Sequence, residues 1–248
     1  MLSSPEGKPN IRYRIWEHPK EGCFYAIGID PAGPSERGSQ SAMRCWKDRP
    51  RQLVAESCGM VTEEILASEA AKFGQYYNNA HLAVEVFSFG RTTLSLLLSG
   101  SDVYNIKPYP NIYRGPSTAD LQAGIHRPTG SYGWSADPLR RRIMFMVARK
   151  ALQFAKGNPG CMLDALALRE YYNVIWVDGK PRAAPGERDD RVVADALAWL
   201  IFEQDLFAYP TDPKEQRKDK MFYIENNQIM FNPKSKPPKK EGERRLFA

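Results

Sequence analysis

Three acidic positions in this 248-residue chain have the residue types and placement to hold a divalent cation. Asp30 ends the apolar run FYAIGID, Glu85 ends HLAVE, and the pair Asp189 and Asp190 opens DDRVVADALAWLIF. An acid at the end of a short apolar strand adds nothing to a core, and carboxylates gathered without a cation repel each other. Ligands that offer only oxygen suit Mg²⁺ or Mn²⁺. This is the arrangement that a divalent-metal nuclease needs.

The elements that must position these acids follow an alternating pattern of strands and helices. Three closely spaced apolar runs predict an antiparallel meander at 23–29, 39–47 and 51–58. The spacing then predicts a helix at 62–78 with Thr62 as its N-cap, a strand at 81–87, a helix at 92–100 and a fifth strand at 102–109. Asp30 and Glu85 therefore stand at the ends of two central strands of an α/β fold.

Residues 107–136 show no apolar periodicity, and a stretch of this length inside a compact domain is usually functional. Candidates for contacts with DNA phosphates in this loop are Lys107, Arg114, Arg127 and Tyr132. Solvated loop charges are the alternative interpretation.

The remaining elements are helical, with one short strand. A helix at 137–155 has Asp137 as its cap and Pro138 at its first position. A helix within 162–173, the strand VIWV, the turn DGK and a long helix from Asp189 to Phe207 follow.

The last helix contains three acids, and helical geometry separates them. Asp189 is placed to cap the helix with its side chain, which leaves Asp190 free to face Asp30 and Glu85. Asp195 is expected on the opposite side, in an i,i+4 pair with Arg191. Substitution of Asp190 by Ala is therefore expected to eliminate activity, substitution of Asp189 to impair it or to lower stability by about 1 kcal/mol as a lost cap would, and substitution of Asp195 to do least.

Composition places the chain among globular proteins with a mildly basic folded part. The net charge is +6, and six Lys or Arg against two Glu from residue 231 onward account for +4 of it. We expect a polar lead-in at 1–22, one domain at 23–208, and a largely unfolded basic tail at 209–248. The four cysteines lack CxxC spacing, so reduced thiols rather than a zinc site are expected. No apolar run suggests a membrane span or a signal peptide, which favours a soluble intracellular protein.

The turn GIDPAGPS has the Gly-x4-Gly frame of a phosphate-binding loop but lacks its chemistry. Pro34 stands where the loop requires a lysine, and it also removes a backbone N–H. No Gly-x4-Gly-Lys-Ser/Thr motif occurs anywhere in the chain, so nucleotide binding by that mechanism is not expected.

The order of elements resembles the nuclease domain of the large terminase subunit of tailed bacteriophages. The resemblance rests on the stretches AIGIDPAG, AVEVFSFG, SYGWSADPLRRRIMFMVARKAL and VDGKPRAAPGERDDRVVADALAWL, and spans residues 24–207. It implies a ribonuclease H-like α/β fold, with a mixed five-stranded sheet flanked by helices and the first three strands antiparallel. Family members commonly have a histidine directly before the two aspartates. Arg188 stands there in this chain, so that histidine's role does not carry over.

The resemblance also implies roles for the acids. Asp30 becomes the first-strand acid that bridges two Mg²⁺ or Mn²⁺ ions, Glu85 the fourth-strand acid, and Asp190 or Asp189 the acid that begins the last helix. The implied activity is endonucleolytic cutting of double-stranded concatemeric DNA during genome packaging in the host cell cytoplasm. Implied partners are the portal, the small terminase subunit and a packaging ATPase domain, and the missing phosphate-loop motif leads us to expect that this chain is the nuclease half, either excised or encoded separately.

Two other functions are compatible with the same residues. A resolvase- or transposase-type nuclease shares the superfold, and fold alone does not separate it from a terminase nuclease. A non-catalytic DNA-binding module would tolerate loss of Asp30 and Glu85, whereas a nuclease would not.

Overall fold

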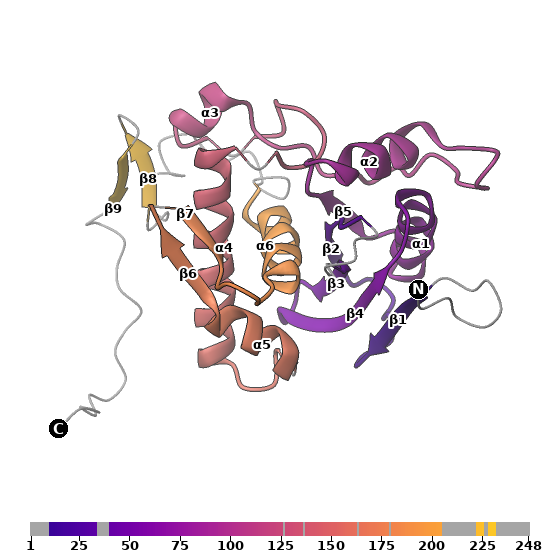
Figure 1. Ribbon diagram of the computed structural model, residues 1–248, viewed down its shortest axis with the longest axis horizontal. Coiled ribbons are helices and arrows are strands. Elements are labelled where there is room, and N and C mark those ends of the chain that lie inside the picture. The colour runs from indigo at the N-terminus through magenta and orange to yellow at the C-terminus, as the bar shows by residue number, and fades with distance from the viewer. Residues whose placement is uncertain are drawn as a thin grey trace.

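A mixed five-stranded sheet forms the centre of the computed structural model, which describes residues 10–33, 40–125, 127–135, 137–162, 164–178, 180–204, 222–225 and 228–231 (Figure 1). Its strands are β1 (Asn10–Ile15), β2 (Tyr25–Asp30), β3 (Ser41–Lys47), β4 (Gln52–Met60) and β5 (His81–Val84). They lie in the order β1-β4-β3-β2-β5, and only β2 and β5 are parallel neighbours. The predicted α/β class, five-stranded sheet and antiparallel meander are confirmed.

One strand of the sheet differs from the sequence-based expectation. β1 falls inside the segment expected to be a polar lead-in. Its alternating charged residues make this edge strand look like a polar segment in the sequence. The expected strand at 102–109 is wrong, because the chain turns back there through hydrogen bonds between the backbones of Ser101 and Ile106.

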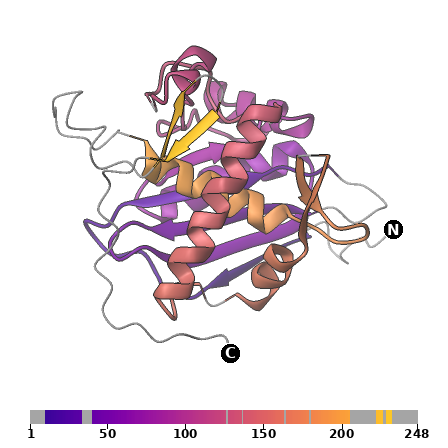
Figure 2. The same ribbon diagram turned by 90° about the vertical axis from the view of Figure 1, so that its left-hand side faces the viewer.

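Helices cover both faces of the sheet (Figure 2). α1 (Glu63–Tyr76) and α2 (Phe89–Ser99) pack on one face, and α4 (Pro138–Gly157) and α6 (Asp190–Glu203) on the other. α5 (Ala165–Tyr172) lies beside α6. Because side chains alternate along a strand, Ile27 and Ile29 of β2 face α1 and α2, whereas Asp30 shares the α6 face with Ala26.

α6 lies unusually close to β2. A Cβ at Gly28 would stand 1.8 Å from the backbone oxygen of Ala194, so only glycine permits this approach. α6 is buried from Arg191 to Ile201, on all its faces. Asp190, one turn before Ala194, is thereby brought to the end of β2 that carries Asp30.

The capping predictions had mixed outcomes. Asp137 accepts the backbone N–H of Arg140 at 3.0 Å and Pro138 is the first residue of α4, as predicted. Thr62 stands at the N-cap of α1 but makes no capping bond, and its side chain is hydrogen-bonded to Glu64. All four cysteines are free thiols. Within the described parts of the chain, no helix has the length and apolar character to cross a bilayer.

The segment 107–136 is more ordered than its sequence suggests. It contains α3 (Thr118–Gln122), and its residues 111–114 and 132–134 form bridges to β5 and to each other. Two hairpins stand outside the main sheet, β6 (Val174–Val177) with β7 (Lys180–Ala183), and β8 (Phe222–Glu225) with β9 (Gln228–Phe231). The second lies within the tail expected to be unfolded. The rest of that tail, and Pro34 of the phosphate-loop-like turn, lie outside the described residues.

Candidate metal centre

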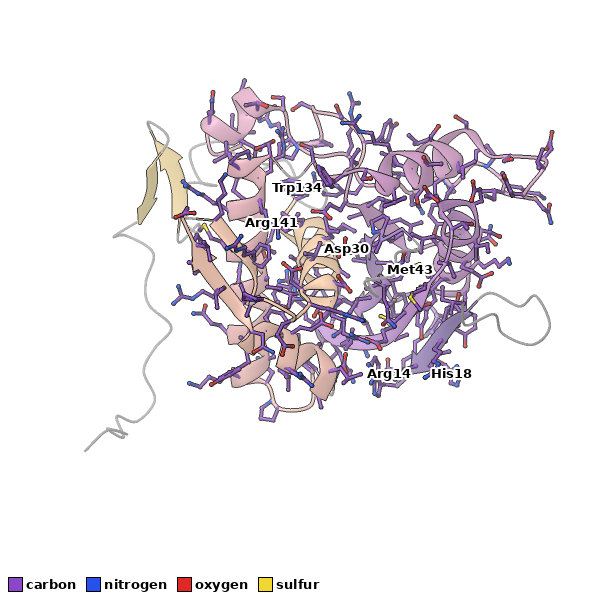
Figure 3. The ribbon with its side chains drawn as sticks, viewed as in Figure 1. Arg14, His18, Asp30, Met43, Trp134 and Arg141 are labelled. Atoms are coloured by element: carbon purple, nitrogen blue, oxygen red, sulfur yellow. The ribbon has the colours of Figure 1, made fainter. Side chains whose placement is uncertain are left out.

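The predicted acids meet at one edge of the sheet. The backbone N–H of Glu85, the residue after β5, donates to the carbonyl of Ile29 at 3.0 Å, which sets Glu85 beside Asp30. α6 begins at Asp190 on the same side, where the backbone N–H of Gln40 lies 3.4 Å from its carboxylate. Figure 3 shows Asp30 at this edge, with Arg141 of α4 nearby. Three elements far apart in the chain thus bring their acids together.

Burial and mutual repulsion shift these carboxyl groups toward their neutral forms. Burial, and then the charges of Glu85 and Asp190, raise the pKa of Asp30 well above its usual value. A hydrogen bond between Asp30 and Glu85 favours the protonated form of Asp30. Burial raises the pKa of Glu85, and burial with the charge of Glu170 raises the pKa of Asp190 to about 6.

The predicted capping role of Asp189 is wrong. Asp189 stands at the N-cap of α6, but its side chain makes no capping bond and instead accepts from Arg141 at 3.1 Å. The carboxylate of Glu170, from α5, accepts the backbone N–H of Arg191 at 2.7 Å. A residue of another helix therefore satisfies the first turn of α6, which leaves Asp189 directed toward the acids.

The predicted pair between Asp195 and Arg191 is also wrong. Asp195 is fully buried and accepts from Arg44 Nε and from Trp46 Nε1, each at 2.7 Å. Arg191 instead binds Glu170, at 2.5 Å. Because both faces of α6 are packed, neither residue has the solvent-exposed surface that an i,i+4 pair on a free face requires.

Asp195 belongs to a buried ionic network under α6 that the sequence analysis missed. Glu56 of β4 lies opposite Arg14 of β1 and Arg44 of β3 in the sheet register, and forms ion pairs with both. Arg44 also pairs with Asp164, the N-cap of α5. The available signal was a charged residue at the centre of each apolar run SAMRCWK and LVAESC.

Two of the four predicted DNA-contacting residues lie in the segment that pairs with the region of β5, Tyr132 toward the acids and Arg114 with its carbonyl bonded to Gln204 at the opposite end of α6. The backbone of Trp134 pairs with Glu85, and Tyr132 precedes Trp134 by two residues and is 46% exposed. The guanidinium of Arg114 lies 5.7 Å from the ring centre of Tyr132, and its Nε donates to Gly130.

The other two residues are not brought to the acids by any described contact. α2 begins beside Glu85, because Gly90 packs against the Glu85 carbonyl, and Lys107 lies beyond the opposite end of α2. Arg127 is exposed in the segment after α3. Contact of any of the four with DNA stays a prediction.

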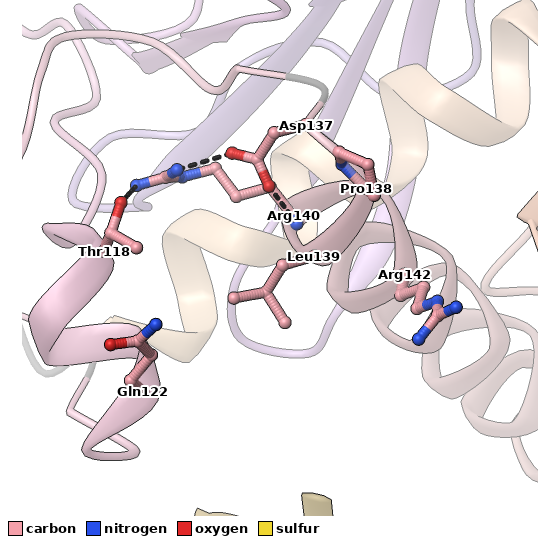
Figure 4. A pocket seen from close by; sticks show the side chains of 7 residues that line it. All are labelled: Thr118, Gln122, Asp137, Pro138, Leu139, Arg140 and Arg142. Atoms are coloured by element: carbon pink, nitrogen blue, oxygen red, sulfur yellow. Dashed lines mark hydrogen bonds and ion pairs between the residues drawn. The ribbon is translucent and has the colours of Figure 1, made fainter. Parts of the chain in front are cut away.

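A cavity of about 550 Å³ lies away from the acids, where α3 meets the start of α4 (Figure 4). Arg140 lines it and donates to Asp137, to Thr118 and to the carbonyl of Pro116. These contacts join α4 to the 107–136 segment, so we interpret this cavity as part of a structural junction.

The donor set of the acidic edge suits a hard divalent cation, since it offers only carboxylate oxygens that repel one another. Among the residues that the structure describes, however, no three His, Cys, Asp or Glu side chains are arranged to hold an ion. Asp30 is hydrogen-bonded to Glu85, and Asp189 forms an ion pair with Arg141. Metal binding therefore requires these side chains to exchange their present partners.

Comparisons with known proteins identify the fold. No protein-family model and no curated protein matches the chain. The large terminase nuclease from thermophilic phage G20c with bound magnesium is similar, with 17% identity, coverage of 77% of this chain and 89% of that chain, and a TM-score of 0.51. A structure of that nuclease with bound cobalt gives the same values. A third structure of it has 16% identity, coverage of 77% and 90%, and a TM-score of 0.51.

The chain therefore has the ribonuclease H-like α/β fold, with its mixed five-stranded sheet and flanking helices. The particular resemblance, to the nuclease domain of the large terminase subunit of tailed phages, is confirmed as a likeness of fold over most of the chain.

Proposed function

We propose that this chain is a divalent-metal-dependent endonuclease that cuts double-stranded DNA. The observation that carries the proposal is the meeting of Asp30, Glu85 and the pair Asp189 and Asp190 at one edge of the sheet, from three elements. Four acids on a structural scaffold would be a costly arrangement, because burial and repulsion hold three of them above their usual pKa.

Asp30, Glu85 and Asp190 would hold two Mg²⁺ or Mn²⁺ ions, with Asp189 as a further ligand. Bound divalent ions lower the pKa of an attacking water and neutralise charge at the scissile phosphate. The protein's part is to hold the ligands on rigid elements. The close packing of α6 on Gly28 and the hydrogen bond that the backbone N–H of Arg191 donates to Glu170 would serve this purpose.

The likeness to phage terminase nucleases supports a biological role in genome packaging. The substrate would be concatemeric DNA in the host cytoplasm. The partners would be a portal, a small terminase subunit and a packaging ATPase domain. Tyr132 would contact the DNA backbone beside the acids, with Arg114, Lys107 and Arg127 further along it.

A plasmid-cleavage assay tests the proposal. We expect nicking in Mg²⁺ or Mn²⁺, none in EDTA, and none by Asp30→Asn. Asp102→Asn, which changes an exposed acid in the turn after α2, is the matched control and should cut normally. Cutting in EDTA, or by Asp30→Asn, would refute the nuclease assignment. Intact DNA binding without cutting by the wild type would favour a non-catalytic module.

A further inference from the structure

Arg141 is a cation that the protein itself places among the acids. Its Nη2 lies 3.1 Å from Oδ2 of Asp189, and its Nη1 lies 3.9 Å from Oε1 of Glu85. The side chain is 27% exposed, and Glu85 and Asp189 are 12% and 21% exposed, so solvent screens these charges only in part. Figure 3 labels Arg141 on α4 and Asp30 on β2.

The position of Arg141 is fixed from its other side. Its Nε donates to the carbonyl of Pro181 in β7 at 3.1 Å, and its guanidinium lies 5.0 Å from the ring centre of Phe145. Its neighbours Arg140 and Arg142 line the cavity of Figure 4 instead. Of the three consecutive arginines, therefore, Arg141 is the one directed toward the acids, and its bond to the β6–β7 hairpin holds it there.

This placement sets Arg141 in competition with any other cation. A lone pair of Asp189 that accepts from Arg141 is not available to a metal ion at the same time, and the positive guanidinium beside Glu85 and Asp189 disfavours a second cation there. The binding free energy of a metal ion at this site is therefore reduced by the interaction free energy of Arg141 with the two acids.

Release from the acids would leave Arg141 suited to a second partner. Since Nε is bound to Pro181, the two Nη groups would remain at the site with their donors free of Asp189 and Glu85. A guanidinium presents paired N–H donors that match the oxygens of a phosphate group.

We propose that Arg141 is an exchangeable counter-ion, paired with Glu85 and Asp189 before metal binds and with a DNA backbone phosphate afterwards. This inference rests on the proposed nuclease function and adds a residue to it. Arg141 then restrains metal binding in the free protein and assists cleavage in the complex.

The two roles predict opposite effects of one substitution. In Arg141→Gln, Mn²⁺ titrated calorimetrically without DNA should bind roughly tenfold tighter, the factor for one lost charge-assisted hydrogen bond. Single-turnover plasmid cleavage at saturating Mn²⁺ should fall roughly 100-fold. A residue that only supports the fold would weaken both. Arg141→Lys keeps the positive charge but not the paired N–H donors of the guanidinium. Its Mn²⁺ affinity should therefore stay near that of the wild type, while its rate of cleavage falls.

Arg149→Gln is the control, because it removes the same charge from an exposed position of the same helix. It should match wild type in Mn²⁺ affinity, and thermal melting should show that each variant is folded. Unchanged or weaker Mn²⁺ binding by Arg141→Gln, or its undiminished cleavage, overturns the role of Arg141 and leaves the nuclease intact. A wild type that neither binds Mn²⁺ nor cuts overturns both proposals.

Discussion

Asp195→Ala should destabilise the protein strongly, although the helical pattern alone predicts that Asp195 matters least. Its carboxylate is completely buried and accepts hydrogen bonds from Nε of Arg44 and Nε1 of Trp46, both at 2.7 Å. The hydroxyl of Tyr171 lies 3.4 Å away. Alanine removes the acceptor of all three donors at a position that is completely buried in α6.

The size of the effect follows from the two short bonds. Loss of the charge-assisted bond to Arg44 costs about 1.5–3 kcal/mol, and an unsatisfied buried N–H on Trp46 costs about 1–3 kcal/mol. Arg44 keeps Glu56 and Asp164 as partners, so it does not become an isolated buried charge. We expect a loss of about 4 kcal/mol, a large fraction of the roughly 5–15 kcal/mol that stabilises a typical protein.

Urea unfolding followed by tryptophan fluorescence measures this loss. With a slope of about 2 kcal/mol per molar urea, the midpoint should fall by about 2 M without a change in slope. Asp102→Ala, at an exposed turn, is the control and should stay within about 0.5 kcal/mol of wild type. A loss below about 1 kcal/mol for Asp195→Ala would refute the reasoning, since it would mean that the network contributes little.

Three further predictions concern stability and DNA affinity. Burial raises the pKa of Asp164, but the charge and hydrogen bond of Arg44 outweigh it and lower that pKa to about 2. Asp164 therefore stabilises the fold above its unfolded pKa near 4, and this contribution is lost as the pH falls through about 2. Between pH 5 and pH 1.5, wild type should lose roughly 2 kcal/mol more than Asp164→Asn in urea unfolding, and equal losses would contradict this. Gly28→Ala should abolish soluble expression, because its Cβ would stand 1.8 Å from an α6 backbone oxygen, whereas Gly157→Ala, with nothing within 4 Å, should express normally. Truncation after Phe231 removes six basic residues and should flatten the salt dependence of DNA binding without changing cleavage, and an unchanged slope would show that the tail only aids solubility.

The sequence by itself determined the features that depend on neighbouring residues. Alternation and helical spacing located the meander, β5, α1, α4 and α6, and the acids at strand ends pointed to the edge where they meet. These inferences hold because strand and helix periodicity, and the cost of placing an acid beside an apolar run, act within a few residues of each other.

Tertiary structure alone decided which partner each charged residue would take. Asp195 binds Arg44 across 151 positions of the chain, and Glu170 caps α6 from another helix, while the local alternatives for Asp189 and Asp195 stay unused. β1 joined the sheet because β4 offered it an edge and because Ile11 and Tyr13 reach the side of the core and Phe73 of α1. The physical reason is common to all these cases. α6 is buried on every face, so each polar group at its surface must find a partner among whatever elements pack against it, and local spacing carries no information about those elements.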